Sequence, residues 1–164
     1  MLWMGAKPED SPWRCAIDWA VMDTYIPGVP DFSALLRTDQ EVLRRIDCLV
    51  DQDARRARSL WLMFLSGEGM QLPAVVPIDD VPERPDPQDV QNLCGVIADV
   101  LMRAAPGGSA VVTLTRSGSE TVDDTDRYWF RALHGAARER GAPIRMLCLA
   151  TQAGVRQLTL DDAG

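Results

Sequence analysis

Two apolar runs joined by a short glycine-containing loop constrain the fold of this chain most strongly. The run SLWLMFL follows Arg58, and the run MQLPAVVPI follows the loop SGEG. Two strand-like runs separated by such a loop are typical of a β-hairpin. Because the first run is almost continuously apolar, we expect both of its faces to be covered. Pro73 and Pro77 lack an N–H donor, so they predict that the second strand lies at an edge of the sheet or ends early.

Helices and further strands are predicted on both sides of this hairpin, from apolar residues at helical spacing and from short apolar runs bounded by glycine or proline. In chain order the expected elements are a helix over 39–50, the hairpin, a helix from Asp86 that ends before Pro106, a strand over 109–115, a helix over 124–140 ended by Gly141, and a second hairpin formed by IRMLCLA and VRQLTL. This order predicts an α/β fold with a central mixed sheet flanked by helices. We expect residues 58–164 to form this core. Residues 1–57 are expected to form an N-terminal helical extension packed on it, within one compact domain.

Composition excludes several classes of protein. The chain has 164 residues, 46% of them hydrophobic, which is enough for a core that needs no disulfide or metal. Its 24 acidic and 17 basic residues give a net charge of -7, which argues against binding to nucleic acid or to anionic membranes. No signal peptide is evident, and no apolar run approaches the roughly 18 residues of a membrane span. We therefore expect a cytoplasmic protein with no nucleic-acid or membrane partner.

The cysteines and the tryptophans carry two further expectations. The cysteines are far apart and form no C-x-x-C pair, so neither a zinc ribbon nor a disulfide framework is expected; they are Cys15, Cys48, Cys94 and Cys148. The last three lie in apolar stretches and are expected to be buried. Trp3, Trp13 and Trp19 are expected to dock either on the core of the chain itself or on a partner, because exposed tryptophans are a liability. That partner would be an unknown protein or a second copy.

The stretch TLTRSGSETVDDTD, residues 113–126, joins a predicted strand to a helix N-terminus, where backbone N–H groups converge. With the order of elements from Arg58 to Leu160, it resembles the RadC-like branch of the JAB/MPN metal-hydrolase superfamily. In that branch a strand ends in His-Asn-His-Pro-Ser-Gly and the next helix starts with Ser-x-x-Asp, and the two histidines and the aspartate bind zinc. Without a gap, the alignment places Ser117 and Gly118 on Ser-Gly, Asp123 on the helix-start serine, and Asp126 on the zinc-binding aspartate. The resemblance implies a JAB/MPN fold of the cytidine-deaminase-like type.

The departures from this pattern concern the ligands. Thr113 and Thr115 stand at both histidine positions, and a threonine hydroxyl replaces imidazole poorly on zinc. Residues 70–78, where the resemblance would place the catalytic glutamate, contain no acid. The resemblance therefore implies a metal-free pseudoenzyme, a non-catalytic interaction or scaffold domain without a cofactor. Its vestigial site would comprise Thr113, Thr115, Ser117, Asp123 and Asp126.

Other interpretations of the same residues need no family. Asp123 and Asp126 can cap the helix that follows them. An enzyme could hold a hard cation such as Mg²⁺ through the oxygen atoms of the loop 113–126. A sensor could bind a small anion through backbone N–H groups and Arg116. The single histidine, His134, lies on an arginine-rich helix face, so it is expected to be solvated and to form no catalytic dyad.

Overall fold

The computed structural model describes residues 35–164, and these form a mixed five-stranded sheet with helices on both faces. The strand order is β2-β1-β3-β4-β5. The elements are α1 (Asp39–Leu49), β1 (Ser59–Leu65), β2 (Gln71–Ile78), α2 (Pro87–Ala104), β3 (Ser109–Thr115), α3 (Asp124–Arg140), β4 (Ile144–Thr151) and β5 (Gly154–Leu158), with short 3-10 helices at Ala54–Arg56 and Leu160–Ala163. The predicted mixed α/β class is confirmed.

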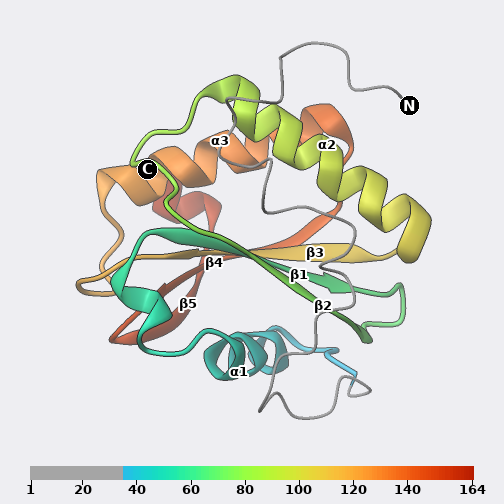
Figure 1. Cartoon of the computed structure of the whole chain (residues 1–164), viewed down its shortest axis with the longest axis horizontal. Helices are drawn as coiled ribbons and strands as arrows, with labels where there is room; N and C mark the ends of the chain where they lie inside the picture. The colour runs from blue at the N-terminus through green and yellow to red at the C-terminus, as the bar shows by residue number, and fades with distance from the viewer. Residues whose placement is uncertain (1–34) are drawn as a thin grey trace.

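The sheet combines two hairpins with one parallel crossover. β1 pairs antiparallel with both β2 and β3, β3 runs parallel to β4 through the crossover helix α3, and β5 returns antiparallel to β4. Helices α2 and α3 cover one face of the sheet, and α1 covers the other (Figure 1). The result is a three-layer arrangement in which the central strands are buried on both sides.

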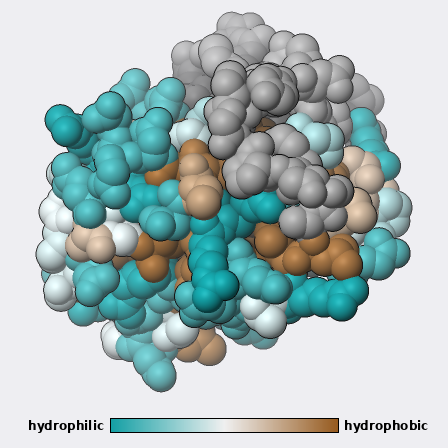
Figure 2. All heavy atoms as spheres, turned by 90° about the horizontal axis from the view of Figure 1, so that it is seen from below, coloured by the Kyte–Doolittle hydropathy of each residue, from teal (hydrophilic) through white to brown (hydrophobic). Residues whose placement is uncertain are grey.

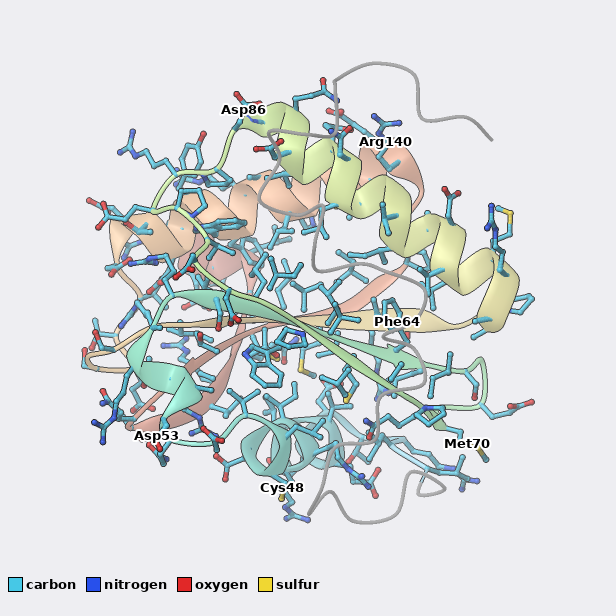
Figure 3. The ribbon with its side chains drawn as sticks, viewed as in Figure 1. Cys48, Asp53, Phe64, Met70, Asp86 and Arg140 are labelled. Atoms are coloured by element: carbon cyan, nitrogen blue, oxygen red, sulfur yellow. The ribbon has the colours of Figure 1, made fainter. Side chains whose placement is uncertain are left out.

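Each face of the sheet has its own hydrophobic core, which confirms that both faces of the first hairpin strand are covered. Leu62 and Phe64 of β1 belong to the core under α2 and α3, and Phe64 points toward that layer in Figure 3. Met63 and Leu65 belong to the core under α1. Because side chains alternate along a strand, one continuous apolar run supplies both cores.

The second strand of the hairpin, β2, lies at an edge of the sheet, as its prolines predict. It does not end early, since its ladder with β1 runs to Ile78. Pro73 and Pro77 are both exposed. Pro77 lies opposite Trp61 at the regular end of the ladder, and Pro73 lies where the register shifts between Val75 and Gln71, both of them positions that an edge strand tolerates.

Capping residues fix the helix boundaries close to the predicted ones. Thr38 accepts a hydrogen bond from the N–H of Glu41, whose carboxylate accepts from the N–H of Thr38 in return. Asp86 caps α2, and Pro87 occupies its first turn. Gly141 ends α3 in the left-handed conformation, with φ of 64°. The predicted extents of all three helices are confirmed within a residue or two.

The predicted N-terminal extension falls partly within the described residues. Its helix α1 packs on the sheet through the buried side chains of Val42, Ile46 and Leu49. Trp3, Trp13 and Trp19 lie outside the described residues. The described surface on the α1 side is mostly hydrophilic, with small separate hydrophobic areas (Figure 2). No helix within 35–164 has the length and apolarity needed to cross a membrane.

The core under α2 and α3 predicts a sharp contrast between two positions of the same helix. Ile97 is fully buried, whereas Met102 is 73% exposed. Replacing Ile97 by alanine should lower the free energy of unfolding by about 2–5 kcal/mol, because it leaves a cavity. The matched change Met102→Ala should alter it by less than about 0.5 kcal/mol. Urea unfolding of both variants measures the difference, and equal effects would contradict this assignment of helix faces.

Candidate functional site

The stretch 113–126 is organised by a buried ion pair between Arg116, directly after β3, and Asp126, in the first turn of α3. Arg116 Nε donates to Asp126 Oδ1 at 2.9 Å, and Arg116 Nη2 donates to Oδ2 at 2.6 Å. The side chain of Asp126 is fully buried and that of Arg116 is 8% exposed. Two parallel hydrogen bonds between a guanidinium and a carboxylate form the geometrically most specific type of ion pair. The pair therefore links the end of β3 to the start of α3.

The remaining N–H groups of Arg116 hold the loop between these two elements. Nη1 donates to the carbonyl oxygens of Ser117 and Ser119, and Nη2 donates to that of Thr121. With the bonds to Asp126, all five N–H donors of the guanidinium are engaged. The hydrogen bonds and charge of Asp126, with the nearby charge of Asp123, raise the pKa of Arg116 above its ordinary value despite burial. This guanidinium therefore has no donor left for an anion.

Asp123 and Asp126 also form the capping box of α3. The Asp123 carboxylate accepts from the N–H of Asp126 at 2.8 Å, and the Asp126 carboxylate accepts from the N–H of Asp123 at 3.0 Å. The capping role predicted for Asp123 is confirmed. Asp126 has a second role that capping does not include, because its oxygens bind the guanidinium as well. Both oxygens of this carboxylate are thus already engaged.

Thr113 and Thr115 belong to the other face of the sheet. They alternate along β3 with Val112 and Leu114, which lie in the core under α2 and α3. Thr115 Oγ1 donates to the carbonyl oxygen of Ala57 at 2.8 Å and accepts from the N–H of Ser59 at 3.1 Å, while Thr113 hydrogen-bonds the thiol of Cys148 in the core on the α1 side.

The five residues of the predicted vestigial site therefore do not converge. Asp123 and Asp126 meet at the start of α3, and the exposed Ser117 contributes a carbonyl oxygen to the Arg116 guanidinium. The hydroxyl groups of Thr113 and Thr115 are engaged on the opposite side of β3. Arg116 is the residue whose role the sequence alone did not reveal. The sequence feature that could have indicated this role is the position of Arg116 at the end of a predicted strand, ten residues before Asp126 in the first turn of the next predicted helix.

Two expectations about reactive side chains are wrong in part. Cys48 is exposed and points away from the sheet on the outer side of α1 (Figure 3), because the inward face of that helix is formed by other positions. Cys94 and Cys148 are buried as expected. His134 is half-buried and stacks on Phe130 one helical turn earlier, with ring centroids 5.6 Å apart, so it is not fully solvated.

Two further features of the described residues bear on ligand binding. They contain no group of three or more His, Cys, Asp or Glu side chains placed to hold a metal ion. A polar, open pocket of about 300 Å³ lies at the end of the sheet beside the β1–β2 turn and includes Arg37, Glu68 and Arg145. Arg145 is engaged there with the carbonyl oxygens of Leu36 and Arg37. Arg145 and the carbonyl oxygen of Gly69 thus hold the segment before α1 at one side of this pocket.

Comparison with protein-family models, with curated proteins and with solved structures found no match for this chain.

The buried ion pair predicts strong coupling between its two partners. Arg116→Met and Asp126→Ala should each lower the free energy of unfolding by about 3–5 kcal/mol, because each leaves an uncompensated buried charge. The double variant should lose less than the sum of the two, by about 1–3 kcal/mol. As a control, Arg127→Met breaks the pair with exposed Asp124 and should cost less than about 1 kcal/mol. A double-mutant cycle in urea measures the coupling, and additive losses would contradict it.

The cysteines predict different reactivity in the native protein. Burial raises the pKa of Cys94 to about 11 and that of Cys148 to about 12. Because the thiolate is the reactive form, both should resist alkylation by iodoacetamide at pH 8 until the chain unfolds. Exposed Cys48 should react in the native state. Peptide mass spectrometry before and after addition of urea measures the three sites, and native labelling of Cys148 at the rate of Cys48 would contradict the burial.

Proposed function

We propose that this chain is a non-catalytic protein-interaction or scaffold domain of JAB/MPN type, derived from a RadC-like metal hydrolase that has lost its metal. The observation that carries the proposal is the ion pair of Arg116 with Asp126. The resemblance assigns Asp126 to zinc, yet both of its oxygens already bind an internal guanidinium or a backbone N–H. An arginine supplies the positive charge that a metal would otherwise bring to this carboxylate.

Replacing this arginine by a metal ion would be costly. The guanidinium is 8% exposed and its carbonyl partners belong to the same short loop, so a cation at Asp126 would require the whole loop to rearrange. A displaced buried arginine would also lose its ion pairs with Asp123 and Asp126, which costs several kcal/mol. Thr113 and Thr115 supply no compensating ligands, because their hydroxyl groups are engaged on the other face of β3. Each of these points favours a metal-free domain.

The order of elements also supports the proposed ancestry. The resemblance rests on a hairpin, a helix, a strand, the loop 113–126, a helix and a second hairpin, and the described chain has these elements in this order. The loop itself lies between the parallel strand β3 and the helix α3 that crosses to β4. An inherited scaffold in this position would explain why Asp126 stands where the family has its zinc-binding aspartate, while its partner in this chain is an arginine.

The two alternatives for the same loop receive less support. A hydrolase with an oxygen-ligated hard cation would need several free carboxylates at one point. The loop brings the carboxylates of Asp123 and Asp126 together, but both are already engaged in the capping box. A small-anion sensor would need donors, and the Arg116 guanidinium has all of its donors engaged. We therefore propose neither as the main function.

Metal content tests the proposal directly. Protein purified without a metal-affinity tag should contain far less than one equivalent of zinc by elemental analysis. Incubation with Zn²⁺ or Mg²⁺ should not raise its melting temperature, because a ligand stabilises only a fold that binds it. Near-stoichiometric zinc, or a metal-dependent rise in Tm that Asp126→Asn abolishes, would overturn the pseudoenzyme proposal.

A further inference from the structure

The two edges of the sheet differ in how they can pair with another strand. At the β2 edge, Pro73 and Pro77 have no N–H donor to offer, and Pro73 lies where the register of β2 with β1 shifts between Val75 and Gln71. The segment before α1 bridges the start of the strand through Leu35 and Met70. Prolines on an edge strand are a common protection against further pairing. The β2 edge is therefore closed to a partner strand along most of its length.

The β5 edge carries no such protection. Gly154–Leu158 contains neither proline nor lysine, and its register with β4 is regular, without a bulge. Among the described residues, no backbone group pairs with the outer side of this strand. Natural edge strands that are left straight and unblocked offer a row of N–H and C=O groups to another strand.

The side chains at this edge also allow a second strand to approach. Arg156 is paired with Asp162 at 2.8 Å on the α3 side, and its charge is thereby compensated. Val155 and Gln157 point to the other face of the sheet, the α1 side, where their β4 partners are Ala150 and Cys148. The side chains at this edge are therefore one arginine whose charge is compensated within the same chain and two uncharged residues. They place no uncompensated charge in the way of an identical strand.

We propose that β5 is a homodimer interface, in which the β5 strands of two copies pair antiparallel and join the two sheets into one. Antiparallel pairing of identical strands is self-complementary about a two-fold axis. In the register centred on Arg156, Val155 of each copy lies opposite Gln157 of the other. The two Arg156 side chains then face each other, each with its charge compensated by Asp162 of its own copy. Because the outer edges of this joined sheet are the proline-blocked β2 strands, the association stops at the dimer and does not continue into a fibre.

This inference goes beyond the proposed function and is independent of it, since it rests on the strand edges and not on the loop 113–126. A chain that bound zinc could dimerise in this way, and a metal-free chain could fail to do so. Elemental analysis therefore decides the first proposal, and the mass in solution decides the second. Neither result predetermines the other.

The test compares two equal charge changes in the full chain. Gln157→Lys places a lysine on the β5 edge, whereas Gln152→Lys adds the same charge in the exposed β4–β5 turn, outside the edge. Sedimentation equilibrium at chain concentrations from low micromolar to millimolar should show a monomer–dimer equilibrium for the unaltered protein and for Gln152→Lys. The dissociation constant of Gln157→Lys should rise by about tenfold, because a charged side chain on an edge strand, lysine above all, opposes pairing with another strand.

Hydrogen exchange followed by mass spectrometry locates the interface in the unaltered chain, so it does not depend on any variant folding. Amide protection of a peptide covering β5 should increase with chain concentration, while that of a peptide covering β2 should not. A monomer at every concentration would overturn the proposal. So would a dimer that Gln157→Lys leaves intact, or protection of β5 that does not change with concentration, which would mean that the chain covers this edge itself.

Discussion

The buried pair of Arg116 and Asp126 is the interaction on which one whole end of the molecule depends. It is formed by the residue that follows β3 and by the first turn of α3, so it fixes the point where the parallel crossover begins. A fully buried carboxylate is stable only with a hydrogen-bonded countercharge. Arg116 provides it, and the same guanidinium also binds three carbonyl oxygens of the loop between β3 and α3.

The same pair shapes what this end of the sheet can do. A helix N-terminus beside a strand end is a favoured position for anions, metals or substrates, because its N–H groups and dipole are unpaired. Here the two aspartates of the capping box accept hydrogen bonds from the N–H groups of Asp123 and Asp126, and Arg116 binds the carboxylate of Asp126. The carboxylate, the guanidinium and these two N–H groups therefore satisfy one another. Among the described residues, β5 is the edge strand of the sheet that contains no proline.

Much of the fold could be predicted because its signals are local. Pro73 and Pro77 mark an edge strand by their missing donors, and Asp86, Asp123 and Gly141 mark helix ends by the hydrogen bonds or the backbone angle they allow. The predicted burial of Cys48 is wrong because apolar neighbours in the sequence do not determine which face of a helix a residue occupies. The predicted solvation of His134 is wrong in part, because the arginines on its helix face gave no indication that its ring stacks on Phe130 one turn earlier.

The sequence by itself determined the elements, their order, the edge position of β2 and the capping of α3, since each depends on residues close together in the chain. Only the tertiary structure decided which residues share a site. Thr113 and Thr115 match the spacing of a metal motif, but the alternation of side chains along β3 turns them to the face opposite Asp126. Arg116 reaches Asp126 because the loop between β3 and α3 folds so that the strand end and the first helical turn meet, a conformation that the spacing of ten residues does not itself specify.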